Sequence, residues 1–114
     1  MFDYERHCLS YYKIQKDFCK KLQLPEESIN EIRNVLKNVL YFSKEGYIVE
    51  LQGKSVNTIV ASIILFVFKR NKKDNSMNQN IPRISKRSLS TLNKMCIILN
   101  KYQKHLYSKN ICNF

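Results

Sequence analysis

The residue types that most often carry chemistry are few in this chain, and their spacing does not assemble a site. They are four cysteines and two histidines: Cys8, Cys19, Cys96, Cys112, His7 and His105. A structural zinc site needs ligand pairs at short spacing, and no Cys-x-x-Cys pair occurs. Cys8 and Cys19 are eleven residues apart, so one helix face would carry both as small core residues. We expect four reduced thiols and neither a metal nor another cofactor.

Catalytic arrangements are equally sparse. His7 and Cys8 are neighbours, and neighbouring side chains point about 100° apart around a helix. Glu26 and Glu27 follow a proline and suit the first turn of a helix, where negative charge complements the helix dipole. The segment 53–55, Gly-Lys-Ser, lacks the upstream glycine of a phosphate-binding loop. The sequence therefore indicates a protein that is not an enzyme and has no small-molecule substrate.

Positive charge is the strongest chemical signal. The chain has 20 Lys+Arg against 9 Asp+Glu, a net charge of +11. Residues 1–53 hold eight of each sign, whereas residues 54–114 hold twelve cations and one acid, Asp74. Such asymmetry favours a polyanionic partner. The predicted DNA-binding residues are Lys54, Arg83, Lys86, Arg87, Lys94, Asn100, Lys101 and Lys104. Asparagine can pair with adenine through two hydrogen bonds, which makes Asn100 a candidate base reader.

Two interpretations of this charge that involve no ligand remain open. The basic cluster can be a solvated lysine face without a ligand. The run 69–73 can act only on the carboxyl end of the preceding helix, where cations complement the helix dipole.

Length and composition predict an all-α fold. A chain of 114 residues suits one domain. Gly 2 and Pro 2 disfavour the many turns of a sandwich or barrel. The most apolar stretch, 59–68, is far shorter than the roughly 20 residues of a bilayer span, so it predicts a core helix. The charged opening residues lack a following apolar run, so we expect a protein that is not secreted.

Apolar periodicity predicts five helices. We place them at residues 4–22, 25–43, 59–68, 86–93 and 95–107, with a flexible loop over 71–83. The third helix is apolar nearly all round, which is typical of a helix surrounded by others. Ser85 is the expected N-cap of the fourth helix. A turn near Lys94 then makes the last two helices a helix-turn-helix candidate.

Three segments in order resemble one known family. Residues 22–26, Leu-Gln-Leu-Pro-Glu, resemble its "leucine-x-leucine-proline" junction between the first two helices. Residues 51–65 resemble its "glycine-arginine/lysine-serine-proline … isoleucine-alanine-alanine" entry into the third helix. Residues 84–89 with 97–102 look like its final helix-turn-helix. The family is that of transcription factor IIB, whose core consists of cyclin repeats, and the resemblance covers about residues 10–107.

The resemblance implies a single cyclin-like domain over residues 1–114, with a central buried third helix. It implies a transcription initiation factor that binds duplex promoter DNA and bridges it to a TATA-binding-protein-like factor and RNA polymerase. Its expected location is the nucleus, or a cytoplasmic transcription site if the chain is viral. Leu99 falls where the family reads bases with an arginine, and Ile97 where it has threonine, so contacts to the DNA backbone are the firmer expectation.

Two other classes of function stay open. A cyclin-fold adaptor or kinase regulator would use the same fold without binding DNA. A small basic protein bound to an acidic membrane would need an amphipathic helix with an exposed apolar face. The most apolar helix here is expected at the centre of the bundle, which disfavours the membrane.

Overall fold

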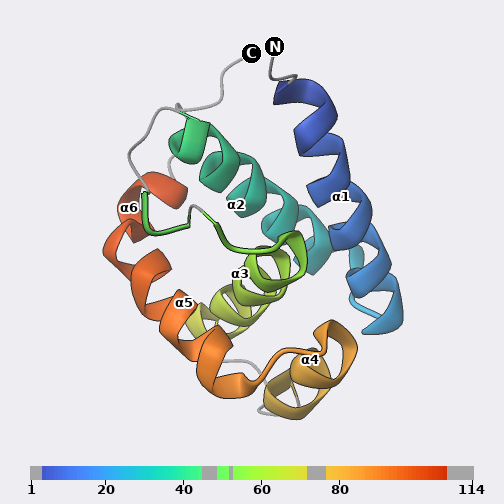
Figure 1. Ribbon diagram of the computed structural model, residues 1–114. Coiled ribbons are helices and arrows are strands. Elements are labelled where there is room, and N and C mark those ends of the chain that lie inside the picture. Colours follow the sequence, from blue (N-terminus) through green and yellow to red (C-terminus); the bar gives the residue numbers. More distant parts are fainter. Residues whose placement is uncertain (1–3, 45–48, 52, 72–76, 108–114) are drawn as a thin grey trace.

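The computed structural model describes residues 4–44, 49–51, 53–71 and 77–107, in which helices are joined by short connections (Figure 1). The helices are α1 Tyr4–Lys21, α2 Glu26–Lys44, α3 Val56–Arg70, α4 Met77–Ser85, α5 Leu89–Lys101 and α6 Gln103–Leu106, with a 3₁₀ turn at Val49–Leu51. No strand occurs within those ranges. The predicted all-α class is confirmed. The first two helices match the prediction to within one residue, and the third begins three residues before the predicted 59–68 and ends two residues after it.

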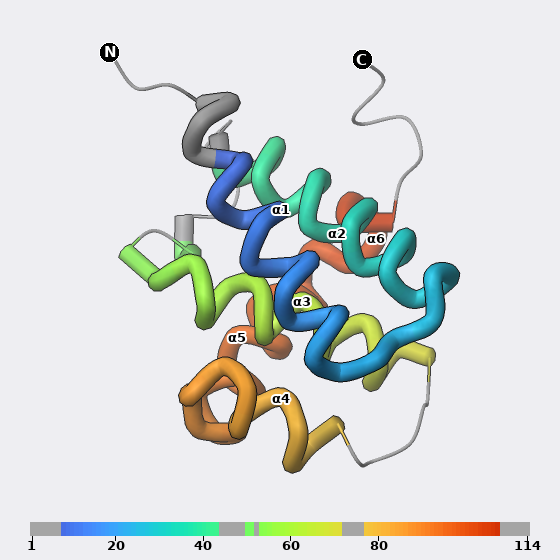
Figure 2. The backbone as a smooth tube through the Cα atoms, turned by 90° about the vertical axis from the view of Figure 1, so that its right-hand side faces the viewer, coloured from blue at the N-terminus to red at the C-terminus, as the bar shows by residue number. Residues whose placement is uncertain are grey.

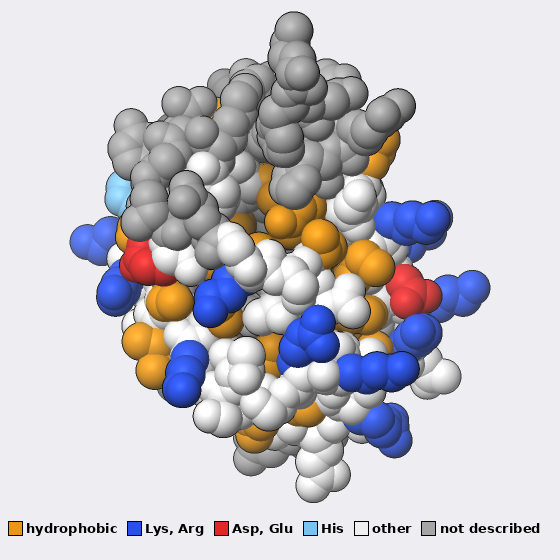
Figure 3. Space-filling view, in the orientation of Figure 1, with side chains coloured by type: hydrophobic (Ala, Val, Ile, Leu, Met, Phe, Trp, Pro, Cys, Tyr) orange, Lys and Arg blue, Asp and Glu red, His pale blue; other side chains and the backbone are white. Residues whose placement is uncertain are grey.

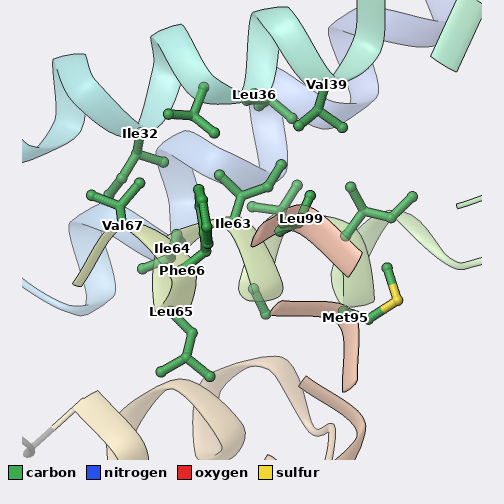
Figure 4. Packing of buried hydrophobic residues seen from close by; sticks show 14 of the residues in the cluster. Ile32, Leu36, Val39, Ile63, Ile64, Leu65, Phe66, Val67, Met95 and Leu99 are labelled. Atoms are coloured by element: carbon green, nitrogen blue, oxygen red, sulfur yellow. The ribbon is translucent and has the colours of Figure 1, made fainter. Parts of the chain in front are cut away.

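The third helix lies at the centre of the bundle, as predicted. Every residue of α3 from Thr58 to Phe68 is buried. The helix contacts α1, α2, α4 and α5, which surround it in Figures 1 and 2. Figure 4 shows Ile63 directed toward the α2 side chains Leu36 and Val39 and Leu65 directed the opposite way, toward α4. An all-round apolar helix is stable here because neighbours cover each of its faces.

Polar groups at the start of α3 are paired. The hydroxyl of Ser55 accepts a hydrogen bond from the backbone N–H of Thr58 at 3.2 Å, which makes Ser55 the N-cap. Ser62, which is fully buried, donates to the carbonyl of Thr58 at 2.6 Å. A buried hydroxyl is tolerated in an apolar core when it is hydrogen-bonded in this way.

The break between α1 and α2 falls where Leu24 and Pro25 predict it. Gln23 adopts a left-handed backbone with φ 55°. The N–H of Leu24 then donates to the carbonyl of Cys19 at 3.2 Å, and the N–H of Gln23 to that of Lys20 at 3.1 Å. These two bonds form a Schellman motif, which satisfies carbonyls that a helix end leaves free.

The loop predicted over residues 71–83 is wrong for its second part, because Met77–Ser85 forms α4. Residues 72–76 lie outside the described residues. The polar composition of the segment obscures a stripe at Met77, Ile81 and Ile84, which packs against the core. Burial of that stripe outweighs weak helix propensity and Pro82, since tertiary packing supplies most helical stability in proteins.

The helices predicted at 86–93 and 95–107 are also wrong in their boundaries. One helix, α5, runs without a break past Lys94, and the four-residue α6 follows Tyr102. The short connection in this part of the chain is therefore residues 86–88, between α4 and α5.

The N-cap of α5 lies three residues after the expected one. Ser85 is the last residue of α4, is buried, and donates to the carbonyl of Ile81 at 2.8 Å. Ser88 is the N-cap of α5 instead, and its hydroxyl accepts from the N–H of Thr91 at 3.2 Å. Both serines have a suitable sequence context, and only their burial distinguishes them.

Cys8 and Cys19 are buried, as expected for small core residues, and Cys96 is buried too; Cys112 lies outside the described residues. Burial raises the pKa of Cys96 to about 11 and raises that of Cys19. Within the described ranges, no helix has the length and apolar character needed to cross a membrane.

Candidate nucleic-acid interface

The turn between α4 and α5 has a defined geometry. Lys86 adopts a left-handed backbone with φ 58°, and its N–H donates to the carbonyl of Pro82 at 2.8 Å. This conformation ends α4 and redirects the chain so that Ser88 can begin α5. The side chain of Lys86 remains exposed. The turn therefore presents a cation between the two helices.

Arg87 links this turn to the beginning of α3 through hydrogen bonds. Its Nε donates to Oγ1 of Thr58 at 2.9 Å, and its Nη2 donates to Oγ of Ser55 at 3.2 Å. Its Nη1 donates to the carbonyl of Lys86 at 3.2 Å. The planar guanidinium supplies these donors in a fixed fork, which lysine cannot reproduce. The predicted DNA contact Arg87 is thus also a residue that positions the turn.

Cationic side chains continue along the outer face of α5. Ser90, Lys94, Ile97 and Lys101 recur at three- and four-residue steps and are all exposed. Ile97 exposes 65 % of its surface, an unusual fraction for a large apolar side chain. Lys94 and Lys101 lie about 10 Å apart along the helix axis, since the rise is about 1.5 Å per residue.

The remaining predicted residues lie on several elements. Lys54 is exposed beside the N-cap of α3, and Lys104 is exposed on α6. Arg83 is exposed on α4 and donates to Oδ1 of Asn80 at 3.3 Å. Lys101 pairs with the carboxylate of Glu50 at 3.6 Å. Four of these cations are exposed and have no acidic partner among the described residues, and we refer to them together as the α5 basic surface: Lys94 on α5, Lys86 in the turn before it, Lys104 on α6 and Lys54 before α3.

Asn100 lies away from the start of α5. It lines a groove of about 520 Å³ between the carboxyl end of α3 and α5, together with Phe66, Lys69, Arg70, Asn93, Cys96, Ile97 and Gln103. In helix-turn-helix proteins the N-terminal residues of the second helix reach the base edges. In this chain the exposed residues near the start of α5 are Ser90, Thr91 and Lys94, and the sequence-based prediction did not include the first two because it began the second helix of the pair near residue 95.

The basic run after α3 contacts its own chain. The ammonium group of Lys69 donates to Oδ1 of Asn93. The guanidinium of Arg70 lies 4.0 Å from the ring centroid of Tyr107, a cation–π contact. These contacts tie the end of α3 to α5 and α6. They favour the interpretation in which Lys69 and Arg70 support the helix end; Lys72 and Lys73 lie outside the described residues.

Two acidic residues of the first half accept hydrogen bonds from residues of the second half. Glu31 on α2 accepts from the hydroxyl of Tyr107 at 3.0 Å and from Nδ2 of Asn71 at 3.1 Å. Glu50 accepts from the hydroxyl of Tyr102 at 3.2 Å. Backbone and Tyr102 hydrogen bonds, with the charge of Lys101, lower the pKa of Glu50.

Exposed cations also lie on α1. Lys13, Lys16 and Lys20 on α1 remain exposed without an acidic partner among the described residues. In Figure 3 cations accordingly extend from the α5 side of the molecule to the α1 side. The neutral count of residues 1–53 therefore does not make α1 a neutral surface.

Comparison of this chain with protein-family models, curated proteins and solved structures finds no match.

Proposed function

We propose that this chain binds duplex DNA through the α5 basic surface, as a transcription initiation factor similar to those of the transcription factor IIB family. The observation that carries the proposal is the α4–turn–α5 unit, a nine-residue helix and a thirteen-residue helix joined by three residues. Exposed cations flank the turn and continue along the second helix. This is the arrangement with which helix-turn-helix proteins approach a DNA groove.

Phosphate contacts would supply most of the affinity and position the domain on the duplex. The exposed Ser90 and Thr91 at the start of α5 would face base edges, where hydroxyl groups can donate or accept. Protein contacts would then select the promoter. By resemblance, the partners are a TATA-binding-protein-like factor and RNA polymerase subunits.

A salt titration tests the proposal. The affinity of the purified chain for a fluorescent duplex of about 20 base pairs is measured by anisotropy between 50 and 200 mM salt. Since each phosphate contact contributes about −0.9 to the slope of log K against log salt, several contacts predict a loss of orders of magnitude. An adaptor that does not bind DNA shows no measurable affinity at either concentration, and that result would overturn the proposal.

A pair of charge-matched variants locates the surface. Lys86, Lys94 and Lys104 are replaced by glutamate in one variant, and Lys13, Lys16 and Lys20 in the other, so that each loses the same positive charge. We expect the first variant to lose at least tenfold in DNA affinity and to show a shallower salt slope by about 2 to 3. The second should change far less. Equal losses in the two variants would show that net charge, and not the α5 basic surface, determines binding.

A further inference from the structure

We propose that a groove between α1 and α2 binds an acidic amphipathic helix from a protein partner. This inference goes beyond DNA binding and does not depend on it. The groove, named here the α1–α2 groove, has a volume of about 820 Å³. Figure 2 shows the two helices side by side on the face toward the viewer.

The floor of the groove is apolar and partly open. Leu9, Tyr12 and Cys19 of α1 line it with Leu24 and with Ile29 of α2. Leu9 exposes 66 % of its surface, an unusual fraction for a large apolar side chain. Because an exposed leucine beside a concave apolar surface gains free energy when it is covered, this floor suits apolar side chains of a partner.

The rim of the groove is basic. Lys13, Lys16 and Lys20 line it from α1, and Arg33 lines it from α2, against one carboxylate, Glu26. The guanidinium of Arg33 lies 5.4 Å from the ring centroid of Tyr12, so this cation bridges the two helices. A partner with carboxylates beside its apolar side chains would complement this rim.

The dimensions fit a helix. From Leu9 to Lys20 the lining extends eleven residues along α1, about 16 Å or three helical turns. Lys13, Lys16 and Lys20 recur at steps of three and four residues, which match the spacing of one face on a helical ligand. Recognition of an amphipathic helix in a groove depends on anchors at this spacing.

Other occupants fit less well. A second copy of this chain carries the same net charge of +11, so the basic rim would repel it. Duplex DNA offers phosphates to the rim but no apolar groups to cover Leu9 and Ile29. An acidic amphipathic peptide satisfies both the rim and the floor.

A selection without a preset sequence tests the proposal. Random 16-residue peptides displayed on phage are selected against the full chain at about 150 mM salt, where screening confines electrostatics to about 8 Å. We expect enriched peptides to carry acidic residues and apolar residues at helical spacing. Their affinity is then measured by fluorescence anisotropy.

Three variants locate the binding. Replacing Lys13, Lys16 and Lys20 by glutamate should weaken peptide binding at least tenfold, and Leu9→Ser should weaken it at least threefold. The matched control, with Lys86, Lys94 and Lys104 replaced by glutamate, should stay within twofold of the parent. Circular dichroism confirms that each variant folds, and Leu9→Ser tests the floor at an exposed position.

Three results would overturn the inference. They are selected peptides without acidic residues, equal loss of affinity in the control, and displacement of the peptide by duplex DNA or by vesicles of anionic lipid. Failure of the DNA titration alone leaves this inference intact, because the two surfaces are tested with different probes and reciprocal variants.

Discussion

Replacement of Arg87 probes how the turn between α4 and α5 is held. Arg87→Ala removes the hydrogen bonds to Thr58 and Ser55 and leaves both hydroxyls on α3. Hydrogen bonds to a charged group contribute about 1.5–3 kcal/mol when well buried. Arg87 is half-buried, so water replaces part of that energy, and we expect a loss of about 1–2 kcal/mol in the free energy of unfolding.

The assay is calorimetry with urea denaturation. For a chain of 114 residues, this loss corresponds to a decrease of about 4–8 °C in Tm. Arg87→Lys should recover little, because a lysine lacks the planar fork. Amide hydrogen exchange should become faster at residues 86–91, and exchange in α1 should change much less, since the lost contacts are local.

A double-mutant cycle decides whether the contact itself is responsible. Thr58→Val removes the Oγ1 acceptor while keeping the shape of a buried side chain. The coupling energy between Arg87→Ala and Thr58→Val should be about 0.5–1.5 kcal/mol. Strict additivity of the two changes would refute the reasoning, because each variant would then act without the other.

Three further predictions concern stability. Gln23→Gly should raise the free energy of unfolding by about 1 kcal/mol in urea denaturation, because glycine adopts φ 55° without strain; Gln23→Ala, the control, should bring no gain. Stability should fall as pH rises from about 9 to 11, because burial raises the pKa of Cys96 to about 11 and also raises the pKa of Tyr11. Above pH 9 the unfolded chain loses protons that the folded chain keeps, so urea midpoints should decline, less steeply in Cys96→Ala; a flat profile contradicts this. Leu65→Ala, at a side chain 1 % exposed, should cost about 2–5 kcal/mol, and a cost below 1 kcal/mol in urea would contradict the packing between α3 and α4.

The secondary structure up to the end of α3 followed from local pattern. Leu24 and Pro25 predicted the break after α1, and the all-round apolar stretch 59–68 predicted the central helix. These features depend on backbone sterics and on hydrophobic periodicity, which short stretches of sequence carry. The helices after α3 could not be predicted in the same way, since α4 depends on burial of Ile81 against the core and not on its own helix propensity.

For the candidate site, too, the sequence made some features visible, and others depend on how the helices pack. The excess of cations from residue 54 onward was visible in the sequence, but which of those cations are exposed without an acidic partner among the described residues was not. The role of Arg87 was not visible, because Thr58 is 29 residues away and only the packing of the turn on α3 brings the two together.

Composition and periodicity by themselves determined an all-helical chain with one buried central helix and a strong positive charge. Only the tertiary structure decided which serine caps α5 and which acids accept hydrogen bonds from Tyr102 and Tyr107. It also decided which lysines of α1 line a groove. The reason is physical: backbone preferences and hydrophobic spacing act between near neighbours in sequence. Burial and charge pairing depend on residues that meet only after the helices have packed.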